Sequence, residues 1–222
     1  MDIRYKRIKE IVEQELHCAA HDLDHVMRVL NLAKKLAECE KAVDMEVLIP
    51  ATLLHDIARA KEEEDSTGKT DHAVAGSEMA EAILQDLSYP KEIIEKIKHC
   101  IISHRYRSNY TPETIEAKIL FDADKLDIMG ATGIARSFIL SGQHGERLYI
   151  ETSIEEYEKN NTRENGRIKD VSKHSSNIEF EIKLKRIPEK LYTDKARKLA
   201  ESRIKYMGIF YDTLKAEIDG KI

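Results

Sequence analysis

Apolar residues recur every three or four positions along most of the chain, which is the spacing of one face of an α-helix. Capping residues, among them Asp22 or Asp24, Asp44 and Thr193, stand where several of these patterns begin. The pattern predicts helices over residues 3–16, 22–37, 44–60, 72–87, 90–104, 111–127, 134–140, 177–191 and 193–218. Alternation of apolar and polar residues is nowhere long enough to predict a substantial sheet, so we expect an all-α protein.

Several stretches interrupt this helical pattern. Pro50 lies inside the third predicted helix and should kink or split it. Residues 61–71 are polar and aperiodic, which predicts an exposed loop that could lie over a site. Gly130 and Gly133 predict a short turn, and over residues 141–176 the pattern weakens to helical fragments joined by loops.

The composition is that of a soluble helical protein. The chain has 222 residues, of which 41% are hydrophobic and 35% charged. We predict a single domain over residues 1–222, with a helical core over 1–140 and a C-terminal helical extension over 141–222 packed on it. No apolar run approaches the roughly 20 residues of a membrane span and no signal-peptide pattern opens the chain, so we expect a cytoplasmic protein. The three cysteines lack a CxxC spacing and predict free thiols.

Charge limits the classes of partner. The formal net charge of −5 argues against sequence-independent nucleic-acid binding, which usually needs a basic surplus to neutralise phosphates. A basic stretch over residues 183–205 and an acidic loop over 62–65 are most simply explained as solvated surface. The basic stretch leaves open a funnel for an anionic substrate, and its helix leaves open a homodimer face, although the apolar stripe of that helix is better explained as core.

Histidine and aspartate stand at the ends of several predicted helices. His55 and Asp56 are adjacent behind an apolar run, so an imidazole and a carboxylate could reach one divalent cation if other segments supply more ligands. The segments that could supply them contain His25, His72, His104 and Asp124. A lone histidine beside an apolar face is more often a hydrogen-bonded core residue than a ligand. Several ionisable groups converging in one core need a common explanation, because each is costly to bury alone, and a metal ion provides it.

This arrangement resembles the HD-domain phosphohydrolase superfamily, and within it the small single-domain prokaryotic predicted HD hydrolases. The pattern of the superfamily is an early His, a His-Asp pair and a later Asp. The matching segments are His25-Val26-Met27-Arg28-Val29, Leu53-Leu54-His55-Asp56-Ile57 and Asp122-Ala123-Asp124-Lys125-Leu126-Asp127. Further matches at His21-Asp22, 131–136 and 195–200 extend the resemblance over nearly the whole chain. The resemblance implies that the metal ligands are His25, His55, Asp56 and Asp124, with Asp56 able to bridge a second ion.

The resemblance also implies roles for two other histidines. His72 and His104 match positions where the superfamily, including its cyclic-dinucleotide phosphodiesterases, places extra histidines that bind a second metal or contact phosphate. Those diesterases carry a second His where this chain has Arg105. We therefore expect one metal ion, with His72 and His104 acting in catalysis as contacts to the phosphate or the leaving group.

Two cations and two carboxylates are further candidates. Arg59, where many members of the superfamily have Lys, and Lys125 could offset the charge of a phosphate, Arg59 through two parallel hydrogen bonds. A surface ion pair is the alternative for each of them. Asp122 and Asp127 could orient the metal ligands from further out. The choice of Asp124 over Asp122 as the ligand rests on the resemblance alone.

The chemistry follows from the ligand set. An ion held by two His and two Asp keeps open positions and lowers the pKa of a bound water, so it supplies hydroxide to attack phosphorus beside His55 and Asp56. We therefore predict a metal-dependent phosphohydrolase that acts on a small phosphomonoester, phosphodiester or nucleotide. The mixed ligands suit Mn, Fe, Co, Ni or Zn better than Ca, and Mg and a second ion are also compatible.

Two alternatives stay open. His21 and His25 lie one helical turn apart with an acid after His21, which is similar to the HExxH motif of zinc peptidases with Asp in place of Glu. That explanation leaves His55, Asp56 and Asp124 without a role. A non-catalytic nucleotide sensor would bind through the same pocket, although a complete set of metal ligands argues against it.

Overall fold

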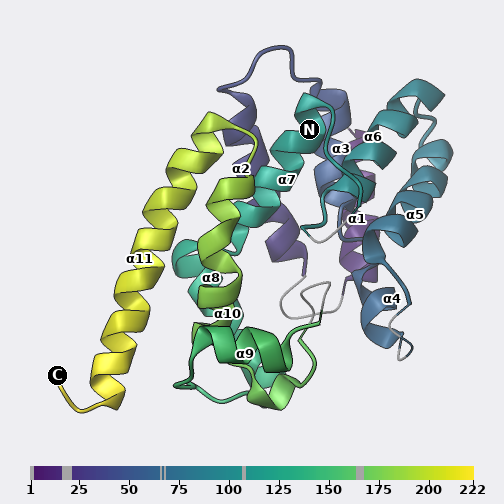
Figure 1. Ribbon diagram of the computed structural model, residues 1–222. Coiled ribbons are helices and arrows are strands. Elements are labelled where there is room, and N and C mark those ends of the chain that lie inside the picture. The colour runs from purple at the N-terminus through teal and green to yellow at the C-terminus, as the bar shows by residue number, and fades with distance from the viewer. Residues whose placement is uncertain (1–2, 17–21, 66, 68, 107–108, 164–167) are drawn as a thin grey trace. The chain divides into compact units, whose positions relative to one another are not determined.

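The computed structural model describes residues 3–16, 22–65, 67, 69–106, 109–163 and 168–222. In these residues the regular structure is helical (Figure 1), apart from one antiparallel bridge between Thr162 and Ile168. The prediction of an all-α protein is confirmed. None of the described helices combines the length and the hydrophobicity needed to cross a membrane.

The chain divides into two compact units, Met1–Asp124 and Lys125–Ile222. The predicted boundary at residue 140 lies inside the second of these units, and the predicted organisation as a single domain stays a prediction. The helices of the first unit are α1 (Ile3–Glu15), α2 (Leu23–Ala37), α3 (Met45–Leu54), α4 (Arg59–Glu64), α5 (His72–Asp86) and α6 (Lys91–Ser103). Helix α7 (Ile115–Asp127) begins in the first unit and ends in the second.

The first unit is assembled around α3. This helix is apolar on all sides, and its Val47, Leu48 and Leu54 are fully buried, as expected of a helix that others surround. It packs against α1, α2 and α6, and α6 packs in turn against α5. Because α3 is central, the residue that follows it, His55, lies in the interior with no exposed surface.

The predicted helix over residues 44–60 is wrong over residues 55–58. Helix α3 continues through Pro50 and ends at Leu54, so the proline does not split it. Pro50 lies in the second turn, where its missing N–H removes one backbone hydrogen bond. A turn over residues 55–58 follows, and α4 then occupies the start of the segment predicted as a loop.

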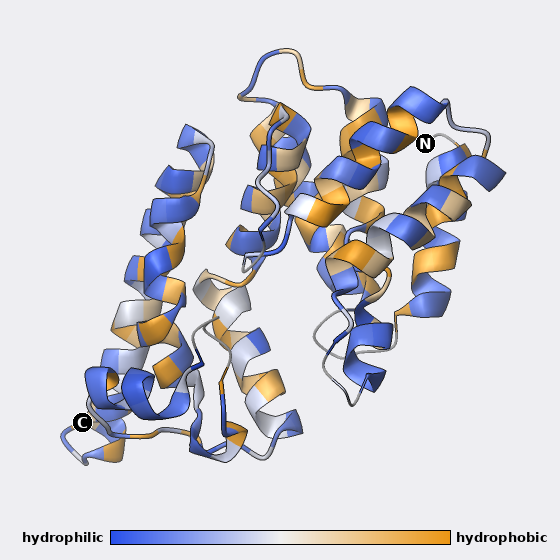
Figure 2. Ribbon diagram, turned by 45° about the vertical axis from the view of Figure 1, so that its right-hand side comes forward, coloured by the Kyte–Doolittle hydropathy of each residue, from blue (hydrophilic) through white to orange (hydrophobic). Residues whose placement is uncertain are grey.

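The other helices of the first unit agree with the prediction to within a few residues at their ends. Many of the helices carry both hydrophobic and hydrophilic stretches (Figure 2). Asp22 rather than Asp24 caps α2, since its Oδ1 accepts a hydrogen bond from the backbone N–H of His25 at 2.9 Å. This cap fixes the first turn of α2, which carries the His25 ring.

The helices of the second unit are α8 (Gly130–Gln143), α9 (Ile154–Asn161), α10 (Ser176–Ile182) and α11 (Asp194–Ile218), with short 3-10 helices η1 (Val171–Lys173) and η2 (Leu184–Lys190). The predicted turn over residues 130–133 is wrong, because α8 begins at Gly130, whose φ of 74° only glycine adopts readily. Thr193 caps α11 as predicted, with its hydroxyl accepting from the N–H of Ala196.

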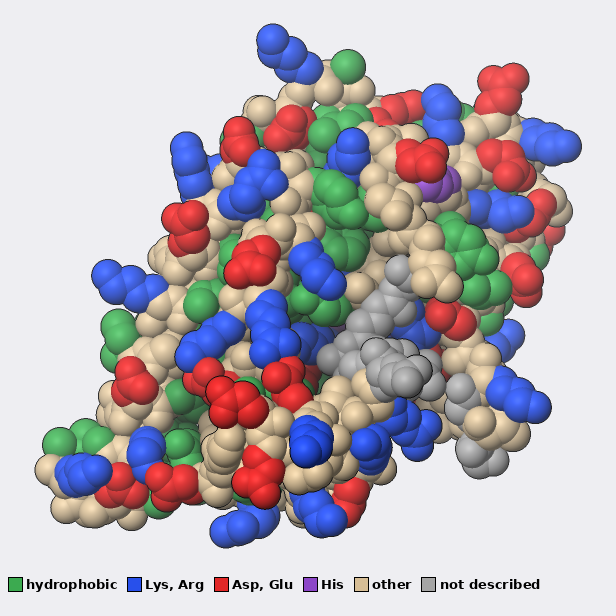
Figure 3. Space-filling view, in the orientation of Figure 1, with side chains coloured by type: hydrophobic (Ala, Val, Ile, Leu, Met, Phe, Trp, Pro, Cys, Tyr) green, Lys and Arg blue, Asp and Glu red, His purple; other side chains and the backbone are tan. Residues whose placement is uncertain are grey.

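The basic stretch over residues 183–205 is partly neutralised by acids one helical turn away. Lys183 pairs with Glu179 and Lys185 with Glu181. Figure 3 shows blue Lys and Arg side chains intermingled with red Asp and Glu side chains over the visible face. The pairing of Lys183 and Lys185 with neighbouring acids supports the explanation of the stretch as solvated surface.

Candidate metal centre

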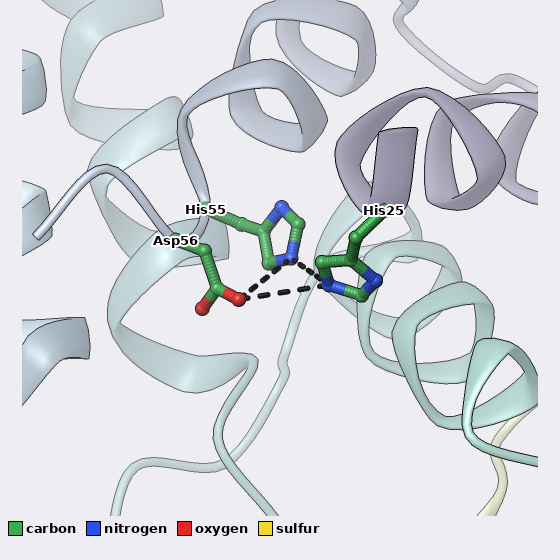
Figure 4. A group of neighbouring side chains, drawn as sticks. All are labelled: His25, His55 and Asp56. Atoms are coloured by element: carbon green, nitrogen blue, oxygen red, sulfur yellow. Dashed lines mark hydrogen bonds and ion pairs between the residues drawn. The ribbon is translucent and has the colours of Figure 1, made fainter. Parts of the chain in front are cut away.

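Four metal-competent side chains of the first unit come from three segments that are far apart in the sequence. His25 lies in the first turn of α2, His55 and Asp56 follow the end of α3, and Asp124 lies in α7. All four are buried, with exposed fractions of at most 8%. Figure 4 shows the rings of His25 and His55 and the carboxylate of Asp56 directed toward a common space. Residues far apart in the sequence are thus brought together.

The spacing of the ligand atoms fits one metal ion. The Nε2 atoms of His25 and His55 are 3.3 Å apart, and each is 3.6 Å from Oδ2 of Asp56. Two ligand atoms on one tetrahedral ion, each at roughly 2.0–2.2 Å from it, are about 3.3–3.6 Å apart. Oδ1 of Asp124 lies 3.6 Å from Nε2 of His25 and 4.0 Å from Nε2 of His55, so Asp124 approaches the same space.

A second group of ligand atoms shares Asp56. His72 is the first residue of α5 and His104 directly follows α6. Their Nε2 atoms are 3.4 Å apart, and each lies 3.5 Å from Oδ1 of Asp56. This triangle also has the dimensions of a metal site. The two oxygens of Asp56 therefore face different pairs of histidines, which is the arrangement of a bridging carboxylate.

In His55, His72 and His104, the hydrogen bond donated by Nδ1 determines that Nε2 is the nitrogen that can bind a metal. Nδ1 of His55 donates to the carbonyl of Thr52 at 2.8 Å, and Nδ1 of His104 donates to the carbonyl of Ile101 at 2.6 Å. In a neutral ring held this way Nε2 carries a lone pair. Nδ1 of His72 donates to Glu62 at 2.7 Å, so Nε2 of His72 and Nε2 of His104 both carry lone pairs and cannot hydrogen-bond to each other across 3.4 Å. The buried Oδ1 of Asp56 accepts no hydrogen bond from a described residue. A cation among these atoms would satisfy them all.

Burial and charge keep these groups in the forms that bind metals. Burial lowers the pKa of His55 from 6.5 to about 4, against the opposing charges of Asp56 and Asp124. Burial also lowers the pKa of His72. It acts to raise the pKa of Asp56, but Arg59 and the neighbouring histidines outweigh it, so that pKa lies well below its usual range. At neutral pH the two rings are neutral and the carboxylate is ionised, as metal ligands must be.

A charged network lies beside the second group. Glu62 accepts hydrogen bonds from Nδ1 of His72 at 2.7 Å and from Nη1 of Arg59 at 2.8 Å. Its other oxygen lies 3.0 Å from Nη1 of Arg105, while Nη2 of Arg59 lies 3.4 Å from Oδ1 of Asp56. The sequence predicts Arg59 near the metal, but its explanation of Glu62 as part of a solvated acidic loop is wrong, because the side chain lies on helix α4 and is only 17% exposed. The three-residue spacing of Arg59 and Glu62 on one helix is the signal that could have identified this pair.

Three further predicted residues lie on α7. Asp122 is fully buried, and Lys125 is buried at the start of the second unit. Within that unit Oδ2 of Asp127 accepts a hydrogen bond from Nη1 of Arg136 at 3.0 Å. The roles predicted for these residues at the metal or the phosphate stay predictions. His21 lies outside the described residues, so the zinc-peptidase alternative that depends on it also stays a prediction.

Comparisons of the sequence with known proteins point to one family. Residues 22–129 match the family model of the HD domain, and this range contains every residue of the two ligand groups. YpgQ of Bacillus subtilis is 31% identical over 206 residues, which cover 91% of this chain and 86% of YpgQ. The 3'-5' exoribonuclease YhaM of the same species is 28% identical over 140 residues, which cover 56% of this chain and 44% of YhaM.

Solved structures extend the similarity to almost the whole chain. The crystal structure of Bacillus subtilis YpgQ in complex with ADP has a TM-score of 0.71 at 28% identity and covers 96% of this chain and 94% of that chain. The crystal structure of a predicted HD superfamily hydrolase from an uncultured Thermotogales bacterium has a TM-score of 0.63 at 28% identity and covers 96% and 91%. From its sequence and its fold, this chain belongs to the HD-domain phosphohydrolase superfamily.

Proposed function

We propose that this protein is a metal-dependent phosphohydrolase and that its substrate is a nucleotide. The observation that carries the proposal is the pair of buried ligand groups that share Asp56, where imidazole and carboxylate atoms converge at the spacing of metal ligands. Membership of the superfamily supports cleavage of a phosphoric ester or anhydride bond. The complex of the similar YpgQ with ADP supports a nucleotide rather than another small phosphomonoester or phosphodiester.

The first ion would be held by Nε2 of His25 and His55, Oδ2 of Asp56 and the carboxylate of Asp124. Nitrogen and oxygen donors together favour Mn, Fe, Co, Ni or Zn, and Mg is compatible with the carboxylates. Such an ion, when bound, activates a water molecule for attack on phosphorus and polarises a phosphoryl oxygen. The packing of the first unit holds the ligand atoms in place, and burial keeps the His55 ring neutral.

The second group supports a second ion. The sequence favours a single ion, with His72 and His104 in contact with the phosphate or the leaving group. Their triangle with Oδ1 of Asp56, with sides of 3.4–3.5 Å, is better explained as a ligand set in its own right. Arg59, whose Nη2 lies 3.4 Å from Oδ1 of Asp56, is then the residue we assign to a phosphate oxygen. Lys125 is proposed as a further phosphate contact because its positive charge, next to Asp124 in the chain, could offset that of a phosphate.

Replacement of Asp56 by Asn tests the proposal, because the amide keeps the shape of the side chain but loses its charge. We expect the wild-type protein to retain a divalent metal after purification and to release phosphate or pyrophosphate from nucleotides with added Mn, Co or Ni. Asp56→Asn should lose the metal and lower turnover roughly 100-fold or more. Elemental analysis and product chromatography measure these two effects.

A matched control and two outcomes complete this experiment. Asp86→Asn makes the same chemical change at the exposed end of α5 and should alter neither metal content nor turnover. Unchanged hydrolysis in Asp56→Asn would contradict the proposal. Nucleotide binding without turnover under any of these metals would identify a sensor instead.

A further inference from the structure

Glu62 lies one layer outside the second ligand group and joins three positively charged or hydrogen-donating side chains. Its Oε2 accepts from Nδ1 of His72 at 2.7 Å and from Nη1 of Arg59 at 2.8 Å, and its Oε1 lies 3.0 Å from Nη1 of Arg105. The side chain is only 17% exposed. A carboxylate with several close partners in this position is more than a surface charge.

The contact with His72 determines which ring nitrogen faces the metal group. An ionised carboxylate can only accept a hydrogen bond, so Nδ1 of His72 carries the proton and Nε2 presents its lone pair toward Asp56. For His55 and His104 the same role is filled by backbone carbonyls, which no substitution removes. His72 depends instead on one side chain, that of Glu62.

The same carboxylate ties the cations of the site in place. Arg59 lies between Glu62 and Asp56, and Arg105 lies between Glu62 and Asp71, with its Nη1 2.8 Å from Oδ2 of Asp71. Without Glu62 the two guanidinium groups would lose their common anion. The position of Arg59 beside Asp56 would then be less restricted.

We propose that Glu62 is a positioning residue of the metal centre, which holds His72 in the tautomer that binds an ion and keeps Arg59 beside Asp56. This inference rests on the proposed function, because it assigns Glu62 to the same site. The expected consequence of losing Glu62 is specific. The His72 ring can then carry its proton on Nε2 and donate it to Oδ1 of Asp56 or to Nε2 of His104, which blocks the metal-binding position.

Substitutions at Glu62 separate this role from simple packing. Glu62→Gln keeps an oxygen that can accept from Nδ1 of His72, whereas Glu62→Ala removes it. Glu62→Met fills the space of the side chain but accepts no hydrogen bond, so it tests the same loss if Glu62→Ala does not fold. Glu64→Ala, at an exposed carboxylate two residues further along α4, is the matched control.

The first readout is the tautomer of His72 in the full-length, metal-free protein. Nitrogen-15 NMR of the histidine rings, assigned with a His72→Gln sample, should give the Nδ1–H form in the wild type, Glu62→Gln and Glu64→Ala. Glu62→Ala and Glu62→Met should shift toward the Nε2–H form. If Glu62 served packing alone, its loss would not change the tautomer of His72. The tautomer would then not depend on the hydrogen-bond acceptor that Glu62→Gln retains.

The second readout is the affinity for Mn²⁺, measured by titration calorimetry. Loss of a residue that orients a metal ligand typically weakens binding 10–100-fold. Glu62→Ala and Glu62→Met should show this loss for the ion bound by His72 and little change for the ion bound by His25 and His55. Glu62→Gln should stay within a few-fold of the wild type in both.

The outcomes distinguish this inference from the proposed function. Wild-type tautomer and affinities in both Glu62→Ala and Glu62→Met would overturn the role of Glu62 even in an active hydrolase. The predicted changes at His72 in a protein that binds Mn²⁺ but hydrolyses nothing would support Glu62 and overturn the hydrolase. A wild-type protein that binds no divalent ion would overturn both.

Discussion

Asp56 shows how its surroundings decide the chemistry of one residue. Each of its oxygens lies 3.5–3.6 Å from the Nε2 atoms of a different pair of histidines. A carboxylate buried to this extent is costly unless positive charge compensates for it. Arg59 supplies part of that charge at 3.4 Å, and the proposed ions supply the remainder. The family resemblance implies that Asp56 can bridge a second ion, but no local pattern in the sequence indicates which histidines each of its oxygens faces.

The buried ring of His55 makes the stability of the metal-free protein depend on pH. Its pKa is about 4 in the folded state and 6.5 in the unfolded chain, so the unfolded chain binds the proton more tightly. Stability from this group is therefore complete above about pH 6.5 and is lost as the pH falls toward 4. At about 1.4 kcal/mol per pH unit, the loss amounts to about 3 kcal/mol over this window. Urea unfolding with a chelator present, at pH 7.5, 6.5, 5 and 4, measures it.

The control for this prediction is an exposed histidine. His144→Gln removes a ring that is about half exposed and should leave the pH dependence unchanged. The burial that lowers the pKa of His72 acts in the same direction, so it adds to the effect. A free energy of unfolding that stays constant between pH 6.5 and 4 would show that the rings are protonated in the folded protein.

At the scale of elements, the histidines of the site lie at helix ends. His25 is in the first turn of α2 and His72 begins α5, while His55 and His104 directly follow α3 and α6. Helix ends can bring polar side chains together without interrupting the buried apolar faces. Periodicity predicts these helices, but which ends meet depends on the packing of α3 against α2 and α6 and of α5 against α6.

Substitution by alanine at two helical glycines should change the stability of the protein in opposite directions. A Cβ at Gly76 in α5 would lie 3.6 Å from side-chain atoms of Ile57 and Ile101, which is ordinary contact. Gly76→Ala should raise the free energy of unfolding by about 0.5–1 kcal/mol, because alanine favours the helix more. A Cβ at Gly133 in α8 would lie 2.2 Å from the carbonyl oxygen of Ile128. Gly133→Ala should therefore lower the free energy of unfolding by about 1–3 kcal/mol. Urea unfolding measures both, and changes of the same sign would contradict this account.

At the scale of the whole molecule, the two candidate ligand groups belong to the same one of the two units. Both ligand groups lie in the unit Met1–Asp124 and within the matched range 22–129. The second unit has a small apolar core of its own around Tyr157, Ile178 and Ile182. The similarity to YpgQ covers 96% of this chain, so the second unit belongs to the shared fold as well.

Metal binding should stabilise the whole protein, because the unfolded chain does not hold the ligand atoms together. Mn²⁺ at about 100 times its Kd should raise the free energy of unfolding by about 2.7 kcal/mol, which corresponds to about 5–11 °C in Tm for a chain of this size. Thermal unfolding in chelator and in Mn²⁺ measures the shift. Asp56→Asn should remove it and Asp86→Asn should retain it. A full shift in Asp56→Asn would place the stabilising ion elsewhere in the protein.

The sequence by itself determined the helical class and named a set of residues to examine together: His25, His55, Asp56, His72, His104 and Asp124. Both are local properties: the period of the apolar residues shows which segments form helices, and the adjacent His-Asp pair stands out where it occurs. The same period does not show where a helix ends, which is why the end of α3 and the start of α8 differ from the prediction.

Only the tertiary structure decided that Asp56 is shared between two pairs of histidines and that Glu62 stands behind His72. In these contacts the atoms are a few ångströms apart, although the residues can be dozens of positions apart in the chain. They are set by how buried helices pack against one another, and no pattern within a single helix encodes that packing.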